Sequence, residues 1–320
     1  MTNPAQTQAA NLSNQSQLPD ADWYEAYARD RVAGLLDPDT FVEFIGPEQR
    51  VMSPHLAQFD LTGAFDDGVV VGRGRLDGQE VFVAAQQGWF LGGAFGEVHG
   101  AKVLGLLRAA RDSAGKGGGP RAVLLLLDTG GVRLQEANAG ELAISEVIGA
   151  ILEVRTAGVP VLALVGGRAG AFGGGGIITA CCSRIIVSQH ARVSVTGPEV
   201  IETNKGVEEF DSKDRALVWR VCGARTRYLT GGADRYVKGR IKDFREAAIA
   251  LMAHAPPFDL ATLKAEQQRL ADRLQRFGDC RDATEIWRKA GLSEPERIAD
   301  ITADAFLAIP RPKGADHDAR

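Results

Sequence analysis

The chain has 320 residues, of which 45% are hydrophobic and 24% charged, and this is the composition of a globular protein. Its formal net charge of −4 argues against nucleic-acid binding, which requires a basic face. No apolar run approaches the roughly 20 residues of a membrane-spanning helix, so we expect no membrane contact either.

Residues 1–20 are rich in Gln, Asn, Ala and Ser and lack the basic and then apolar pattern of a signal peptide. We expect them to be a disordered lead-in and residues 311–320 to be a polar tail. No long linker divides residues 21–310, which we expect to form one domain with C-terminal helices. The four cysteines include no Cys-x-x-Cys pair, so we expect a reducing, cytoplasmic compartment and no metal site.

The N-terminal part of the chain predicts a helix followed by a β-hairpin. Apolar residues at near-helical spacing predict the helix over residues 23–36. Two strand-like runs, residues 69–76 and 80–85, flank the pair Asp77-Gly78, which is a strong hairpin signal.

The middle of the chain repeats one plan, in which an apolar run is followed by a glycine-rich turn and then a helix. A continuous apolar run is typical of a strand that is buried on both faces of a parallel sheet. The alternation of strands and helices predicts an α/β fold. The predicted elements are strands over residues 122–127, 159–165, 184–188 and 192–195, helices over residues 97–112, 140–157 and 171–182, and a mostly helical region from residue 211 onward.

Two buried strands of this plan end in a Gly-Gly pair that is followed closely by an arginine. Glycine lets a backbone approach a ligand, and a strand-to-helix turn directs unpaired N–H groups outward. Two such groups that converge on one point form an oxyanion hole. Tight turning and close helix packing explain the same glycines equally well. The candidate catalytic residues are Gly130, Gly131, Val132, Gly166, Gly167 and Arg168.

The motifs of several other enzyme classes are absent. The sequence contains no G-x-x-x-x-G-K-[ST] phosphate loop, no G-x-G-x-x-G dinucleotide fingerprint and no G-x-S-x-G nucleophile elbow. The five histidines show no metal-ligand spacing, and His99 is the best placed of them to donate a proton.

Residues 128–136 read Asp-Thr-Gly-Gly-Val-Arg-Leu-Gln-Glu, which resembles the Ser-Gly-Gly-Ala-Arg-Met-Gln-Glu segment of the β carboxyltransferase subunit of acetyl-CoA carboxylase. Residues 90–98 resemble that family's Phe-Met-Gly-Gly-Ser-Met-Gly-Ser-Val segment, and residues 196–202 its Ala-Gly-Pro-Arg-Val-Ile-Glu segment. Two features differ, because the four-cysteine zinc element is missing here and Glu199 replaces the arginine after Gly-Pro. Residues 208–223 instead resemble the β subunit of biotin-independent malonate decarboxylase.

The resemblance implies a crotonase fold, which is a spiral of ββα units, and a γ subunit of the same fold as an obligate partner. It implies a malonyl thioester on the phosphopantetheine-type, CoA-like prosthetic group of an acyl carrier protein, with an acyl carrier transferase subunit in the same complex. It further implies decarboxylation through an enolate, with no covalently bound cofactor and no biotin. A biotin-dependent carboxyltransferase subunit and a non-catalytic scaffold for the γ subunit remain alternatives.

Two further groups of residues are expected to bind ligands. Substrate contacts are expected from Gly92, Gly93, Gly170, Phe172 and Arg133. Residues 226–245 are strongly basic, which suits either the phosphates of the prosthetic group, an acidic carrier protein or simply a solvated helix face. The candidate phosphate or carrier contacts there are Arg235, Lys238, Arg240 and Lys242.

Overall fold

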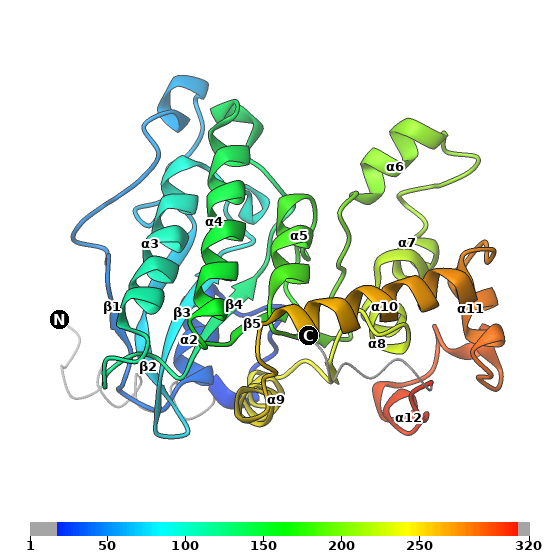
Figure 1. Cartoon of the computed structure of the whole chain (residues 1–320). Helices are drawn as coiled ribbons and strands as arrows, with labels where there is room; N and C mark the ends of the chain where they lie inside the picture. The colour runs from blue at the N-terminus through cyan, green and yellow to red at the C-terminus, as the bar shows by residue number, and fades with distance from the viewer. Residues whose placement is uncertain (1–17, 313–320) are drawn as a thin grey trace.

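A computed structural model describes residues 18–312, and at its centre lies a seven-stranded sheet (Figure 1). The strands follow one another across the sheet in chain order. The first three are antiparallel neighbours, and those from β3 to β7 run parallel. Their bounds are β1 Val42–Glu43, β2 Val69–Leu76, β3 Gln79–Gln86, β4 Ala122–Leu127, β5 Val161–Val165, β6 Arg184–Ser188 and β7 Arg235–Val237.

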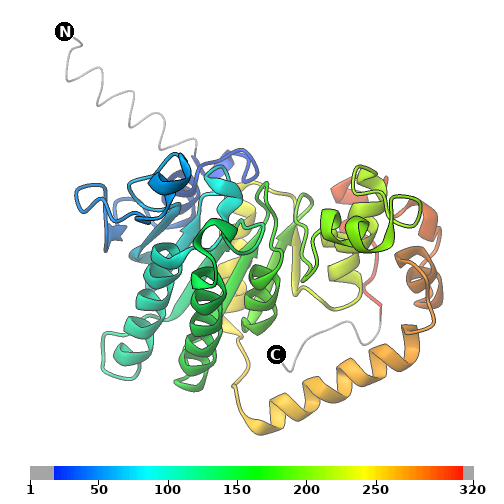
Figure 2. The same ribbon diagram turned by 90° about the horizontal axis from the view of Figure 1, so that it is seen from above.

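Helices cover both faces of the sheet, and further helices extend it at the C-terminal side. Figures 1 and 2 show α3, α4 and α5 side by side on one face and α9 on the other, with α10 running along one side of the molecule. The bounds are α2 Ala28–Leu35, α3 Glu97–Ser113, α4 Ala139–Thr156, α5 Gly174–Cys181, α6 Pro198–Lys205, α7 Arg215–Cys222, α8 Ala224–Leu229, α9 Ile241–Ala253, α10 Leu260–Phe277, α11 Ala283–Lys289 and α12 Ala303–Leu307.

The side chains of β4 show why this strand is apolar throughout. Val123 and Leu125 belong to the core beneath α3, α4 and α5, whereas Leu124 and Leu126 belong to the core beneath α2 and α9. Successive side chains of a strand point to opposite faces, so a strand with helices on both faces must be apolar at every position. The prediction of a doubly buried strand is confirmed.

A second, much shorter set of backbone pairings lies beyond the carboxyl ends of the main strands. Thr129 follows β4, Ala171 follows β5 and Val193 follows β6, and isolated parallel bridges join Thr129 to Ala171 and Ala171 to Val193. Each unit therefore consists of a long strand, a short bridged segment and a helix. This is the repeated ββα unit that the family resemblance implies.

The structure differs from the predicted elements in several places. The helix predicted over residues 23–36 begins only at Ala28, because the Trp23 N–H donates to the Gly239 carbonyl oxygen and its indole stacks on Phe244 at 3.9 Å. Residues 192–195 pair only through isolated bridges and form no strand of the main sheet. Strand β7 was not predicted, since a three-residue strand carries no measurable periodicity. The hairpin at Asp77-Gly78 is confirmed.

The ends of the chain are described only in part. Residues 18–20 of the predicted lead-in form a short 3-10 helix, and residues 1–17 lie outside the described residues. The predicted tail likewise lies outside them from residue 313 onward. Between residues 18 and 312 no helix has the length and apolar character that spanning a membrane requires.

Candidate functional site

The turn after β4 presents one backbone donor rather than three. The Gly130 N–H donates to the Gly92 carbonyl oxygen over 2.9 Å, and the Gly131 N–H donates to the Thr129 hydroxyl oxygen over 3.1 Å. The Val132 N–H donates to no acceptor within the described residues. Of the three residues predicted to act here, only Val132 keeps an available N–H.

The second predicted turn, at Gly166 and Gly167, is a packing site. A Cβ on Gly167 would lie 2.1 Å from the Asp128 carboxyl group, and one on Gly166 would lie 2.7–2.9 Å from Ser188, Phe244 and Trp23. These glycines are required because their neighbours leave no room for a side chain. The N–H groups of Gly167 and Arg168 also donate to no acceptor among the described residues, and the catalytic role predicted for this turn stays a prediction.

The backbone that touches Gly131 belongs instead to Phe172 and Gly173. A Cβ on Gly131 would lie 3.7 Å from the Phe172 carbonyl oxygen and 3.8 Å from the Gly173 Cα. Both glycines have positive φ, +130° for Gly131 and +57° for Gly173, a range that L side chains rarely adopt. Both positions therefore require glycine for their backbone conformation, and Gly173 requires it for space as well, since a Cβ there would lie 3.2 Å from the Gly131 Cα.

Gly174, the residue after this contact, is the first residue of α5 and supplies a second available donor. Its N–H has no acceptor among the described residues, whereas the Gly173 N–H donates to the Val195 carbonyl oxygen over 3.0 Å. The positive end of the α5 dipole adds to the attraction for negative charge at this point. Sequence reasoning missed Gly174, and the signal was the run of four glycines, residues 173–176, directly before a helix.

The residues predicted to bind substrate lie around these two donors. Gly93 packs so closely that a Cβ there would lie 1.7 Å from the Asp128 carbonyl oxygen, whereas a Cβ on Gly92 would meet nothing within 4 Å. The Gly170 carbonyl oxygen accepts the Thr129 N–H, and the Phe172 N–H donates to the Thr129 carbonyl oxygen. These bonds fix the relative positions of the two loops that carry the donors.

Arg133 lies beneath the first turn and is only 1% exposed. Its guanidinium donates to the Asp67 and Glu136 carboxylates, with N–O distances of 2.9 Å to each. Burial raises the pKa of Asp67, although Arg133 acts in the opposite direction. The substrate contact predicted for Arg133 stays a prediction, and its enclosed position favours a role in holding the Val132 turn.

His99 belongs to the same buried cluster as Arg133. Burial, together with the positive charges of Arg133 and Lys102, lowers the pKa of His99 to about 3. Its ring nitrogens lie 3.1 Å from the Asp67 carbonyl oxygen and 3.1 Å from the Gln86 amide nitrogen. A neutral, enclosed imidazole of this kind is poorly placed to deliver a proton to a bound ligand.

Asp128 ties the two loops to the N-terminal helix. Its carboxylate accepts the Ala169 N–H over 2.7 Å and pairs with Arg31 over 2.9 Å, and both partners of this ion pair are 1% exposed. Arg168 was predicted to act through its backbone N–H. Its side chain takes no part in the Arg31–Asp128 ion pair, and its guanidinium lies 3.6 Å from the Trp89 ring centroid. No ligand role of the Arg168 side chain follows from this position.

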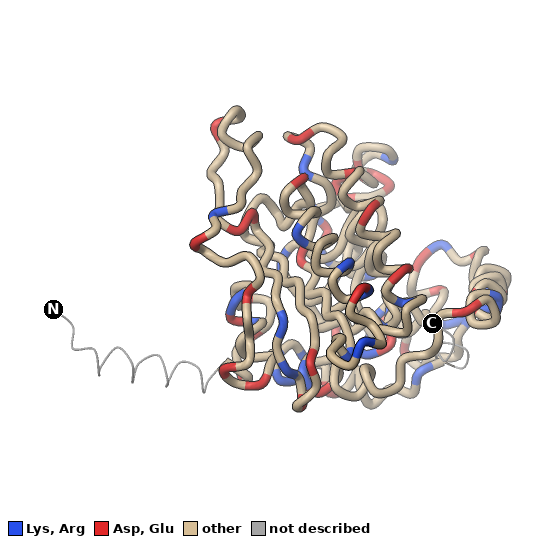
Figure 3. The backbone as a smooth tube through the Cα atoms, turned by 60° about the vertical axis from the view of Figure 1, so that its left-hand side comes forward, with Lys and Arg blue, Asp and Glu red and all other residues tan. Residues whose placement is uncertain are grey.

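The basic residues of 235–242 do not form one helix face, since they span β7, a turn and the start of α9. Lys238 pairs with Asp304, and Arg240 and Lys242 both pair with Asp20. In the view of Figure 3, acidic and basic segments are interspersed over the backbone. The binding role predicted for these residues and for Arg235 stays a prediction, and the carboxylate partners of Lys238, Arg240 and Lys242 reduce the charge that these three offer to a phosphate.

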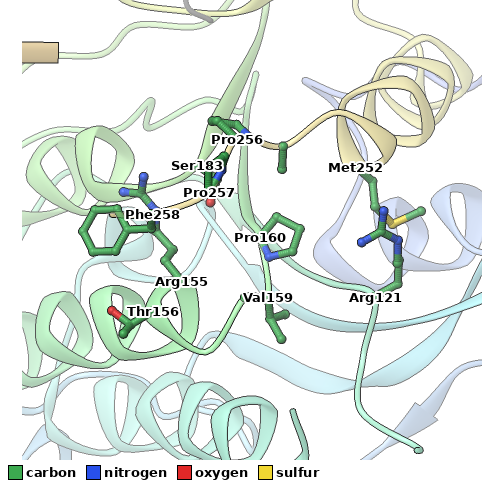
Figure 4. Close-up of a pocket in the computed structure, with 12 residues that line it drawn as sticks. Arg121, Arg155, Thr156, Val159, Pro160, Ser183, Met252, Pro256, Pro257 and Phe258 are labelled. Carbon is green, nitrogen blue, oxygen red and sulfur yellow. The ribbon is translucent and has the colours of Figure 1, made fainter. Parts of the chain in front are cut away.

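A hollow of about 430 Å³ lies at the opposite, amino end of β5 (Figure 4). Its wall includes Arg155, whose guanidinium lies 4.1 Å from the Phe258 ring centroid and donates to the Cys181 carbonyl oxygen. Ligands of open parallel sheets bind beyond the carboxyl ends of the strands. This hollow therefore belongs to the packing of the α9–α10 connection rather than to the site around Val132. Within residues 18–312 no three His, Cys, Asp or Glu side chains are grouped so as to hold a metal ion.

Comparison with known proteins gives the family and the fold. Residues 25–262 match the carboxyl transferase domain family. The malonyl-S-ACP:biotin-protein carboxyltransferase MADC of Malonomonas rubra is 38% identical over 313 residues, which cover 93% of this chain and 98% of that protein. The biotin-dependent acetyl-/propionyl-coenzyme A carboxylase β5 subunit of Mycobacterium tuberculosis is 28% identical over 72% of this chain, but the match covers only 39% of that longer protein.

Among solved structures, a Pseudomonas malonate decarboxylase hetero-tetramer in complex with malonate contains a chain that is 39% identical, with a TM-score of 0.77. The match covers 86% of this chain and 99% of that one. The transcarboxylase 12S core, with methylmalonyl-coenzyme A bound, is 23% identical over 80% of this chain and 49% of that one, with a TM-score of 0.61, and shows the fold alone. The predicted crotonase fold is thereby confirmed.

Proposed function

This chain belongs to the carboxyl transferase family, and we propose that it is the β subunit of a malonate decarboxylase that acts on malonyl thioesters. The coarser statement, that it is a malonate-related carboxyltransferase-like enzyme subunit, follows from the comparisons themselves. The substrate form, the reaction outcome and the residues that act are the proposal. In it, the malonyl group is carried on the phosphopantetheine-type prosthetic group of an acyl carrier protein.

The observation that carries the proposal is the pair of available N–H groups at Val132 and Gly174. Each follows one of the two glycines, Gly131 and Gly173, whose backbones touch. Two preorganised donors beside one another suit an oxyanion, and removing one such donor typically costs about 10²–10³ in kcat. The N-terminus of α5 strengthens the site for negative charge.

The chemistry of decarboxylation uses these donors directly. When the bond between the α-carbon and the carboxylate breaks, CO2 leaves and its bonding electrons pass through the α-carbon onto the thioester oxygen as an enolate. The Val132 and Gly174 N–H groups hold that oxygen while its charge develops. The enolate collapses when the α-carbon takes a proton. Residues 130–132 and 173–176 contain no titratable side chain, so the proton comes from elsewhere in the complex.

A partner subunit is the first place to look for that proton donor. Large apolar side chains lie exposed next to the site, with Leu134 at 78% and Val195 at 59%. Leu134 follows Val132 closely, and the Val195 carbonyl oxygen accepts the Gly173 N–H. Exposed apolar side chains in such a group mark association sites. We assign this surface to a γ subunit of the same fold, within a complex that also holds the acyl carrier protein and the acyl carrier transferase subunit, without biotin.

A second reading is transfer of the carboxyl group to biotin, and the Malonomonas relative favours it because that protein is named a biotin-protein carboxyltransferase. Both readings use the same enolate, so the two donors do not separate them. A non-catalytic scaffold is a third reading. The contact between Gly131 and Gly173 argues against a scaffold, because a scaffold does not need the available N–H groups of Val132 and Gly174 that follow these glycines.

The test is CO2 release by this chain, co-expressed with a partner of the same fold, from malonyl-CoA or malonyl carrier protein. Release that avidin does not reduce supports the decarboxylase. Carboxyl transfer that appears only when biotin is added would identify the chain as a subunit of a biotin-dependent carboxyltransferase. Full activity of the partner without this chain identifies a scaffold and overturns the proposal.

A further inference from the structure

A connected set of buried polar side chains joins the two loops that carry the Val132 and Gly174 N–H groups. None of these side chains is more than 6% exposed. Successive members are joined by a hydrogen bond or an ion pair. We call this set the polar network, and its members are Arg31, Asp128, Gln86, His99, Asp67, Arg133 and Glu136.

One end of the polar network holds the turn of Val132. Arg133 is the next residue, and its guanidinium lies 2.9 Å from the Asp67 carboxylate. The Arg133 backbone N–H donates to the Phe95 carbonyl oxygen over 2.8 Å, and the Phe95 N–H donates to the Gly131 carbonyl oxygen over 2.8 Å. Both neighbours of Val132 in the sequence are therefore fixed by groups on the buried side of the turn.

The other end of the polar network holds the loop after β5, which leads to Gly174. The Asp128 carboxylate accepts the Ala169 N–H of this loop over 2.7 Å. It also fills the space beside Gly167, where a Cβ would lie 2.1 Å from it. The loop is thus seated on a buried carboxylate, and the Arg31 guanidinium balances the charge of that carboxylate.

Gln86 and His99 connect the two ends, and one arrangement of their hydrogens satisfies both. The His99 Nδ1 lies 3.1 Å from the Asp67 carbonyl oxygen, which can only accept, so Nδ1 carries the hydrogen of the neutral ring. The His99 Nε2 is then an acceptor, and the Gln86 amide nitrogen donates to it over 3.1 Å. The Gln86 carbonyl oxygen accepts the Asp128 backbone N–H over 2.9 Å. Residue 86 must therefore supply a donor and an acceptor at once.

A buried network of this kind also stabilises a fold, but the groups that it binds here include the backbones of the loops. Its side chains accept the N–H groups of Glu97, Asp128 and Ala169, which follow β3, β4 and β5 in turn. The Val132 and Gly174 N–H groups lie beyond β4 and β5. One network therefore fixes the backbone of both loops, and a shift of either loop misplaces an oxyanion donor.

We propose that Gln86 is a positioning residue for the reaction: it joins the two ends of the polar network and so fixes the Val132 N–H relative to the Gly174 N–H. This proposal rests on the proposed function and deepens it. Gln86 acts through the Asp128 backbone and through His99, and it does not touch the substrate. Donors lower the barrier only when they are held where the oxyanion charge develops. Loss of Gln86 therefore lowers kcat and leaves substrate binding nearly unchanged.

Gln86→Met tests this role, because it removes both hydrogen-bonding groups at nearly the same side-chain volume. The variant is co-expressed with its partner and assayed for CO2 release from malonyl-CoA. We expect kcat per folded enzyme to fall at least about tenfold while KM stays within about threefold. Gln79→Met, at the exposed first residue of the same strand, is the matched control and keeps wild-type constants. A kcat of Gln86→Met within about threefold of the control overturns the proposal.

Gln86→Glu separates positioning from a loss of stability and keeps the proposal testable if Gln86→Met does not fold. The introduced carboxyl group still accepts the Asp128 N–H, but it bonds to the His99 Nε2 only while one proton lies between them. We expect kcat to approach the wild-type value at about pH 6 and to fall at least about tenfold by about pH 9, as that proton leaves. Urea unfolding at the same pH values checks that the variant is folded. A pH profile of kcat parallel to that of the wild type refutes the role of Gln86.

Failure of the proposed function is recognised separately, from the wild-type enzyme. If the wild type transfers the carboxyl group to biotin and releases no CO2, the proposed function is wrong. The same comparison of kcat is then made on the transfer reaction, which uses the same enolate. A loss of kcat in Gln86→Met supports the positioning role there too, and an unchanged kcat overturns it.

Discussion

Gly131→Ala tests whether the turn that carries Val132 is held in a conformation that catalysis needs. Gly131 has a φ of +130°, which an alanine adopts only at a cost of about 1–3 kcal/mol. Space is not the obstacle, because the nearest atom that a Cβ would meet there is the Phe172 carbonyl oxygen at 3.7 Å. We therefore expect the turn to relax and to move the Val132 N–H. Loss of one oxyanion donor lowers kcat by about 10²–10³, and the free energy of unfolding falls by no more than the strain energy.

Gly78→Ala is the matched control. Gly78 also has a positive φ, +74°, and a Cβ there would meet nothing within 4 Å, but it lies in the β2–β3 hairpin away from the two donors. Urea unfolding and the kcat for CO2 release are measured for both variants. Comparable losses of stability with a large loss of kcat only in Gly131→Ala are expected. If the kcat of Gly131→Ala stays within about threefold of the control, the Val132 N–H is not an oxyanion donor.

Three further variants test the buried framework behind the donors. Arg31→Met leaves the Asp128 carboxylate buried without its ion-pair partner. We expect it to lower the free energy of unfolding in urea by about 3–5 kcal/mol, and a loss below about 1 kcal/mol would contradict this reasoning. His99 has a folded-state pKa of about 3 against an ordinary value of 6.5, so below pH 6.5 the unfolded chain binds a proton that the folded chain refuses, and stability falls as pH falls toward 3. His99 alone changes the free energy of unfolding by at most about 1.4 kcal/mol for each pH unit. We expect His99→Gln to reduce this pH dependence in urea unfolding at pH 7, 5.5 and 4.5. If the free energies of the variant and of the wild type fall in parallel with pH, His99 does not cause the dependence. Gly93→Ala places a Cβ 1.7 Å from the Asp128 carbonyl oxygen, whereas in Gly92→Ala the Cβ meets nothing within 4 Å. In urea unfolding we expect Gly93→Ala to be at least about 2 kcal/mol less stable than Gly92→Ala. Equal stabilities would show that the loop moves to make room for the Cβ and would contradict this reasoning.

Local patterns in the sequence determined most of the framework. The apolar runs predicted β4 and β5, and Asp77-Gly78 predicted the β2–β3 hairpin, because hydrophobic period and turn chemistry involve residues that are neighbours in the chain. The glycine-rich motifs predicted that the site lies in the loops beyond the strands. Periodicity failed where tertiary contacts decide, as at Trp23, whose backbone bonds to Gly239 and not to a helix of its own.

Only the tertiary structure decided which of the glycine N–H groups are available. The sequence presents Gly130 and Gly131 as equivalent to Gly174, yet both already donate to acceptors, on Gly92 and Thr129. It likewise gives no sign that Arg133 is enclosed by carboxylates. The Gly92 acceptor of Gly130 and the Asp67 carboxylate beside Arg133 come from distant parts of the chain, so the composition of a motif does not reveal whether its polar groups are already satisfied. The folded chain settles that question, because it fixes which distant partners lie within bonding distance.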